Sequence, residues 1–121
     1  DSPKPESLLN RARVYMAVAK SKQAKKDFDS FILNDTTNAR AYINRAGTRF
    51  PNDLKGVVID CNRAIVIEPN NKNAYFLRGL ARYDLGEQEK GCEDFKKAIE
   101  FGFSILKIAE QEKCFEFWNE E

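Results

Sequence analysis

A repeat of about 34 residues constrains this chain more than any other feature of its sequence. The segment AYINRAGTRF at 41–50 returns as AYFLRGLARY at 74–83. In the same way, DCNRAIVIEPNN at 60–71 shares its frame with DFKKAIEFGFS at 94–104. A period of this length built from two helices is typical of stacked helical hairpins.

A weaker first copy extends the pattern, as LLNRARVYM at 8–16 and AKKDFDSFILND at 24–35. Small residues recur 34 and 33 residues apart in the first helix of each copy, at Ala12, Ala46 and Gly79. Aspartates recur 33 and 34 residues apart in the second helix, at Asp27, Asp60 and Asp94. Since small side chains let helices approach closely, each hairpin is expected to pack tightly against neighbours of its own kind.

The chain resembles the tetratricopeptide repeat family over nearly its whole length. Beyond the small residue of the first helix, the family's turn glycine falls on Gly86 and its inter-repeat proline on Pro69. The family's large packing residue of the second helix falls on Phe28, Cys61 and Phe95. The resemblance implies an all-α fold, a right-handed α-solenoid of three helix hairpins plus a C-terminal capping helix.

Residues 1–121 would then form a single tetratricopeptide domain. Its repeats are expected at about 6–37, 38–71 and 72–103, with the capping helix at about 104–118. The hairpins would pair helices at roughly 6–19 with 22–34, 38–49 with 53–67, and 72–84 with 87–101.

The second copy departs from the family pattern near its turn. FPND at 50–53 stands where a longer first helix and a glycine turn belong, and Pro51 is expected to end that helix early. Phe31 and Val57 each replace an expected alanine.

The last helix is expected to cover the third repeat. Ser104 is its predicted N-cap, because its hydroxyl can accept a hydrogen bond from the first turn. An apolar stripe at near-helical spacing would lie against the third repeat, formed by Ile105, Ile108, Ala109, Phe115 and Trp118. The alternative is a partner-binding patch made by Phe115, Phe117 and Trp118.

The three cysteines are Cys61, Cys92 and Cys114. Cys61 occupies a core position, where we expect a small buried hydrophobe. Cys92 and Cys114 lie ten residues before and twelve residues after Gly102, so they would sit at similar heights on antiparallel helices. A disulfide between them is one alternative, but we expect two unpaired thiols, because the spacing does not show which way the side chains face.

The sequence lacks the residues of most enzymatic sites. It has no histidine, which removes Ser-His-Asp and Cys-His catalysis as well as histidine zinc sites. It also has no CxxC pair, no GxGxxG motif and no P-loop. We therefore expect no enzyme, no catalytic residue, no metal and no cofactor, and the one enzymatic alternative left is a hydrolase built on carboxylates alone.

The densest charge cluster is KSKQAKK, with Lys20, Lys22, Lys25 and Lys26 around the first hairpin's turn. An anionic partner such as a nucleic-acid backbone would suit it. No aromatic residue is interleaved for base stacking, so a solvated turn is the preferred interpretation. A helical RNA reader would also repeat its base-reading side chains, and Asn10, Asn44 and Leu77 do not.

The resemblance implies a non-catalytic scaffold for protein–protein interaction. In the family, the first helices of successive hairpins line a concave groove that binds a peptide or helix of a partner. The groove residues carried over to this sequence are Asn10, Arg13, Arg40, Asn44, Asn73, Leu77 and Tyr83. An amide such as Asn44 can hold a peptide backbone because it both donates and accepts hydrogen bonds.

One subclass of the family grips the C-terminal carboxylate of heat-shock chaperones with lysines, an arginine and two asparagines. The matching positions here hold Leu9, Arg13, Asn44, Asn73 and Leu77, so a chaperone-tail adaptor is not expected. We expect a monomer with a protein or peptide partner, without nucleic acid and without a membrane span, because no apolar run is long enough. GCEDFKKAIEFG resembles closing repeats of bacterial cell-envelope proteins, which slightly favours the periplasm over the cytoplasm.

Overall fold

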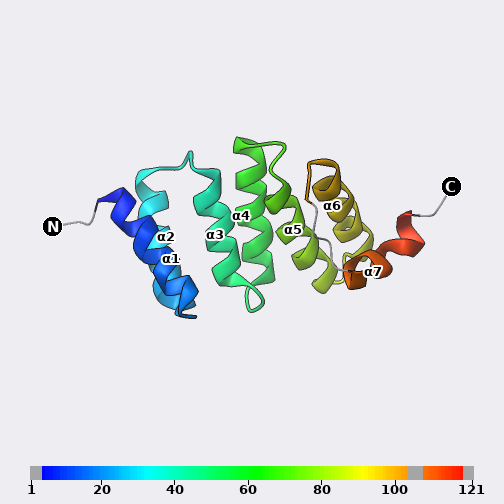
Figure 1. Ribbon diagram of the computed structural model, residues 1–121, viewed down its shortest axis with the longest axis horizontal. Coiled ribbons are helices and arrows are strands. Elements are labelled where there is room, and N and C mark those ends of the chain that lie inside the picture. Colours follow the sequence, from blue (N-terminus) through cyan, green and yellow to red (C-terminus); the bar gives the residue numbers. More distant parts are fainter. Residues whose placement is uncertain (1–3, 104–107, 119–121) are drawn as a thin grey trace.

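The computed structural model describes residues 4–103 and 108–118, with side chains in the last segment from residue 113 onward. The described residues form seven helices arranged along the long axis of the molecule, from α1 at the N-terminal end to α7 at the C-terminal end (Figure 1). They are α1 (Pro5–Ala17), α2 (Ser21–Asn34), α3 (Ala39–Arg49), α4 (Leu54–Ile67), α5 (Lys72–Asp84), α6 (Gln88–Glu100) and α7 (Ile108–Trp118). No strand occurs in the described segments. The predicted all-α solenoid of helix hairpins is confirmed.

The helix ends follow from local chemistry. The side chains of Asn38, Asp53 and Asn71 accept hydrogen bonds of 3.0–3.1 Å from the backbone N–H three residues on, which caps α3, α4 and α5. Pro51 ends α3 as predicted, since Phe50 before it adopts an extended conformation. Gly86 turns the third hairpin with a φ of 94°.

Small residues stand where helices pack most closely. Ala12 and Ala46 have no exposed surface. A Cβ added to Gly79 on α5 would lie 2.9 Å from the carbonyl oxygen of Gly91 on α6. The two backbones are therefore in near-direct contact, and the expectation of close helix packing holds. The predicted packing residues of the second helices are also buried, at Phe28, Cys61 and Phe95.

An arginine on each first helix pairs with the buried aspartate on the second helix of the same hairpin. We call these three pairs, Arg11–Asp27, Arg45–Asp60 and Arg78–Asp94, the Arg–Asp ladder. In each pair Nε and Nη2 donate to the carboxylate, at distances of 2.7–3.1 Å. This two-pronged geometry is the strong form of an ion pair and orients both helices of the hairpin.

The same arginines also join one hairpin to the hairpin before it. Nη1 of Arg45 donates to Asp29 on α2 at 2.9 Å. Nη1 of Arg78 donates to Asn62 on α4, also at 2.9 Å. Asp29 and Asn62 each lie two residues after a ladder aspartate, so the contact repeats with the period of the fold.

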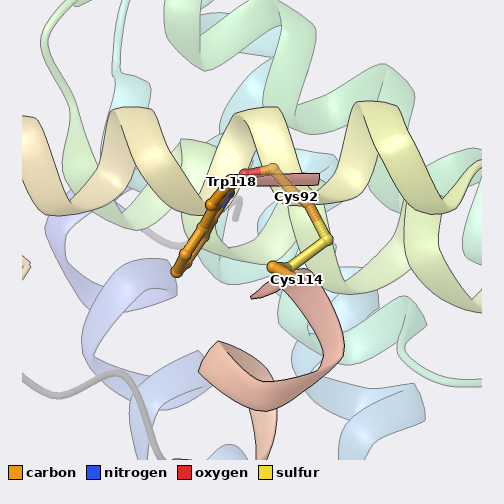
Figure 2. The surroundings of a disulfide bond; sticks show 3 residues. All are labelled: Cys92, Cys114 and Trp118. Atoms are coloured by element: carbon orange, nitrogen blue, oxygen red, sulfur yellow. Dashed lines mark hydrogen bonds between the residues drawn. A yellow bond between two sulfur atoms is a disulfide. The ribbon is translucent and has the colours of Figure 1, made fainter. Parts of the chain in front are cut away.

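The C-terminal cap is covalently attached to the third hairpin. Cys92 on α6 and Cys114 on α7 form a disulfide, with both side chains fully buried (Figure 2). Trp118 on the same helix donates its indole N–H to the carbonyl oxygen of Cys92 at 3.1 Å. The expectation of two unpaired thiols is therefore wrong. The two side chains face one another across the α6–α7 contact, a direction that cysteine spacing alone does not reveal.

The apolar contacts of α7 differ in part from the predicted stripe. Trp118 packs against the cluster of Cys92, Phe95 and Cys114 as expected, and Phe117 packs there too. Phe115 was expected to face inward, but half of its surface is exposed, so that part of the prediction is wrong. With Cys114 turned inward, its neighbour Phe115 points elsewhere on the helix. Ser104, Ile105 and the side chains of Ile108 and Ala109 lie outside the described residues.

Two glycines inside helices give a matched test of close packing. A Cβ at Gly91 would lie 2.8 Å from the Gly79 carbonyl oxygen and 2.9 Å from the Tyr83 nitrogen, whereas at Gly47 it would meet only Met16, at 3.7 Å. Gly47→Ala should raise the free energy of unfolding by about 0.5–1 kcal/mol, the usual helix gain. Gly91→Ala should lower it by ~1–3 kcal/mol because the helices must separate. Urea denaturation of both variants measures this, and a stabilised Gly91→Ala would contradict the close α5–α6 contact.

The ladder predicts unequal costs for removing its arginines. Arg45→Met keeps much of the apolar stem but leaves the fully buried carboxylate of Asp60 without its main donor. We expect a loss of about 3–5 kcal/mol in the free energy of unfolding. Arg11→Met should cost distinctly less, since the Arg11 side chain is 51% exposed against 17% for Arg45. Chemical denaturation measures the free energy of unfolding of both variants. Equal losses would show that burial does not determine how much each ion pair contributes to stability.

Reduction of the disulfide should loosen the cap. The bond closes a loop with a sequence separation of 22 residues, for which chain entropy predicts a stabilisation of ~3 kcal/mol. Denaturation with and without a dithiol reductant should show this loss in the native sequence. The reductant should not shift the midpoint of a Cys92→Ala/Cys114→Ala variant, which retains Cys61. An unchanged midpoint in the native sequence would mean that α7 is held by packing alone.

Candidate functional site

Two adjoining clefts lie where α1 meets α3. The first, which we call the polar cleft, has a volume of about 460 Å³ and is lined by Leu9, Arg13, Asp35, Thr37, Asn38, Ala39, Arg40 and Glu68. The second, which we call the Met16 cleft, has a volume of about 370 Å³ and is lined by Arg13, Met16, Phe28, Arg40 and Asn44. Arg13 and Arg40 line both clefts, so the two form one continuous candidate site.

The helices place the polar groups of this site at regular spacing. Arg40 and Asn44 lie one turn apart on α3 and so share a face, and Arg13 reaches the same clefts from α1. Both arginines are exposed and make no side-chain ion pair within the described part of the chain. Met16 lies beside Gly47, where a side chain would come within 3.7 Å of its methyl group. The site thus offers two unneutralised cations beside an apolar floor.

The two clefts differ in charge. In the polar cleft, Asp35 accepts hydrogen bonds from the Thr37 hydroxyl at 2.6 Å and from the Thr37 N–H at 2.9 Å, and these lower the pKa of the Asp35 carboxyl. Glu68, at the same cleft, accepts a hydrogen bond from Asn71 at 2.8 Å. The Met16 cleft has no carboxylate in its lining. An anionic group is therefore better accommodated in the Met16 cleft.

The other predicted groove residues are not gathered at this site. Asn10 and Asn73 are exposed and line neither cleft. Leu77 packs against a core cluster that includes Ala46 and Cys61. Tyr83 packs under the C-terminal cap, with the ammonium group of Lys113 5.0 Å from its ring centroid. Of the seven residues, Arg13, Arg40 and Asn44 come together.

The ladder arginines were absent from the sequence prediction although they contact the repeat's aspartates. Their signal was available, because Arg11, Arg45 and Arg78 directly precede the small residues Ala12, Ala46 and Gly79. An arginine that recurs in step with an aspartate 15 or 16 residues later indicates a pair across a helical hairpin.

A basic cleft of about 410 Å³ lies at the first turn, lined in part by Lys20, Lys22 and Lys25. Lys25 already pairs with Asp29 at 3.0 Å, which partly neutralises this cluster. Thr48 and Asn52 of the second hairpin line the same cleft.

Cys61 is a buried free cysteine. Burial raises the pKa of the Cys61 thiol to about 12, which keeps it protonated at neutral pH and unreactive. No cluster of metal-ligating side chains occurs in residues 4–103 and 108–118. In the same part of the chain, no helix has the length and apolarity needed to cross a bilayer.

Known proteins resemble this chain in sequence and in fold. The family model described as "Tetratricopeptide repeat" matches residues 73–101, which cover most of α5 and α6. Human "Mitochondrial import receptor subunit TOM70" is 27% identical over 120 residues, which span 95% of this chain but 20% of the human protein. The chain thus corresponds to about a fifth of that relative.

Solved structures agree over more of the fold. The crystal structure of MamA superposes with a TM-score of 0.78 at 28% identity, covering 82% of this chain and 58% of MamA. The first tetratricopeptide domain of Spaghetti (RPAP3), solved with the HSP90 peptide SRMEEVD, superposes with a TM-score of 0.86 at 22% identity. That match covers 98% of this chain and 97% of the domain.

The repeat period, the stacked helix hairpins and these matches lead to one assignment. The fold is that of tetratricopeptide repeat domains, and the family model places the tetratricopeptide repeat at residues 73–101.

Proposed function

We propose that this chain is a non-catalytic scaffold that binds a segment of a partner protein in the clefts between α1 and α3. The observation that carries the proposal is the convergence of Arg13, Arg40 and Asn44 on one open site. The ladder arginines are paired with aspartates, whereas Arg13 and Arg40 have no ion pair among the described residues. In this proposal residues 1–121 act as one monomeric binding domain.

The charge of the site favours an acidic partner segment. A carboxylate in the Met16 cleft would meet two guanidinium groups and no competing acid. The Asn44 amide can bond the backbone of an extended segment, and Met16 offers an adaptable apolar contact beside it. A basic or amide side chain of the partner would suit the polar cleft, where Asp35 and Glu68 lie.

The competing candidate is an anionic surface or RNA held at the lysine cluster. The basic cleft at Lys20, Lys22 and Lys25 is the observation that favours it. The ion pair of Lys25 with Asp29 weakens this candidate, since that charge is already satisfied within the protein.

The two candidates predict opposite results for two sets of charge variants. Arg13→Ala/Arg40→Ala should weaken partner binding by roughly tenfold for each arginine and reduce its dependence on salt, because each makes a charge-assisted contact. Its melting temperature should remain near that of the native chain, since both side chains are exposed. Quantitative mass spectrometry of proteins captured from the source cells by each variant measures the loss.

The matched control is Lys20→Gln/Lys22→Gln/Lys25→Gln/Lys26→Gln, which removes more charge, from the turn of the first hairpin and the start of α2. Capture should survive in this variant. Suppose instead that the lysine-to-glutamine variant loses capture while the Arg13→Ala/Arg40→Ala variant keeps it. The clefts are then not the binding site, and the anionic-surface candidate replaces them.

A further inference from the structure

A second cleft region lies along the edge of the molecule where the hairpin turns are found, the lower edge in Figure 1. The basic cleft lies there, between the first and second turns. A further cleft of about 460 Å³, which we call the Ile59 cleft, lies between α4 and the third turn. It is lined by Lys55, Val58, Ile59, Leu85 and Glu87. It shares no lining residue with the polar cleft or the Met16 cleft, so it is separate from the candidate site.

The basic cleft and the Ile59 cleft occupy equivalent places in successive repeats. Three lining positions correspond by their distance from the ladder aspartate or from the small residue of the first helix, and they are Lys22 and Lys55, Lys25 and Val58, and Asn52 and Leu85. The first pair keeps its charge, whereas the other two change from polar to apolar. Stacking of the hairpins therefore does not require apolar side chains at this place.

Ile59 departs from the repeat in the same way. It directly precedes the ladder aspartate Asp60, and 59% of its surface is exposed. The residues at this place in the other two hairpins are Lys26 and Glu93, both exposed. Val58, beside Ile59, packs against the core and so forms a fixed floor. An apolar surface gathered in a cleft from two elements is typical of a binding surface, unlike a lone exposed apolar residue.

The charge that remains at the Ile59 cleft is positive. Nζ of Lys90 lies 3.4 Å from the Glu87 carboxylate and partly neutralises it. Lys55 makes no ion pair within residues 4–103 and 108–118. Lys55, Val58 and Ile59 lie three and four residues apart, so the free ammonium group and the apolar floor share one face of α4. A complementary ligand therefore joins an apolar side chain to a carboxylate.

We propose that the Ile59 cleft is a second docking site, which binds a segment of a partner protein through an apolar side chain and an adjacent aspartate or glutamate. The apolar side chain would lie against Val58, Ile59 and Leu85. The carboxylate would pair with Lys55, away from the acidic side chain of Glu87. The volume of the cleft is within the range of about 300–1,000 Å³ that is typical of ligand pockets.

A phage-displayed library of random peptides tests this site. Selection on residues 1–121, with counter-selection against Ile59→Lys, retains peptides that need the Ile59 cleft. They should combine leucine, isoleucine or phenylalanine with aspartate or glutamate, and should bind Ile59→Lys at least about tenfold more weakly than the native chain. This variant should keep the native melting temperature, because Ile59 is exposed and Lys26 stands at the same place in the first hairpin. A library that yields no peptide dependent on Ile59 would overturn the proposal.

Two matched variants separate the Ile59 cleft from other surfaces. Val66→Lys adds the same charge to α4 at a residue that is 79% exposed and lies outside the cleft, and it should bind the selected peptides like the native chain. Arg13→Ala/Arg40→Ala should also retain them, so this result does not depend on the clefts between α1 and α3. If Val66→Lys loses binding as much as Ile59→Lys does, or if the arginine variant loses it, the Ile59 cleft is not the site.

Charge reversal tests the chemistry of the partner. Lys55→Glu should weaken binding of the acidic peptides by about tenfold, and a lysine in place of the acidic residue of the peptide should restore binding to this variant. An unchanged affinity of Lys55→Glu would rule out the acidic partner. Analytical ultracentrifugation of the native chain tests a second copy as the occupant. Self-association that Ile59→Lys abolishes would show that another copy fills the cleft, and the proposal of a separate partner would be wrong.

Discussion

The fold depends on arginine–aspartate pairs that are buried between the helices of each hairpin. Asp60 is fully buried, a position that would be costly for a carboxylate without a fixed cation beside it. The arginine from the facing helix supplies two parallel hydrogen bonds, and its remaining nitrogen reaches the preceding hairpin. One side chain therefore sets both the helix pairing within a repeat and the stacking between repeats. The apolar core residues pack between the helices that these pairs orient.

The two ends of the solenoid are treated differently. At the C-terminal end, α7 covers Phe95 and is fastened by the Cys92–Cys114 disulfide and by the Trp118 hydrogen bond. At the N-terminal end Val14 is exposed, and Nη1 of Arg11 has no hydrogen-bond partner among residues 4–103 and 108–118. Because each hairpin contacts its neighbours along one axis, the two ends of the described stack are stabilised by different contacts.

The candidate binding site is formed by side chains of the first helices that take part in neither the ion pairs nor the core. Most arginines on the first helices form ion pairs with aspartates. Leu77 packs in the core, and Tyr83 packs against the C-terminal cap. Arg13 and Arg40 have no ion pair among the described residues, and they line one cleft between α1 and α3. The same stacking that satisfies the ladder thus brings unpaired cations from two hairpins into one site.

The sequence by itself determined the class of fold, because a 34-residue period with small residues in register admits few arrangements. It also determined local boundaries such as the end of α3 before Pro51, where steric exclusion acts on adjacent residues. Only the tertiary structure decided that Cys92 faces Cys114, that Phe115 is exposed and that Arg13 and Arg40 share a cleft. Those outcomes depend on how each helix is rotated about its axis and on contacts between distant segments. The repeat period of the sequence specifies neither.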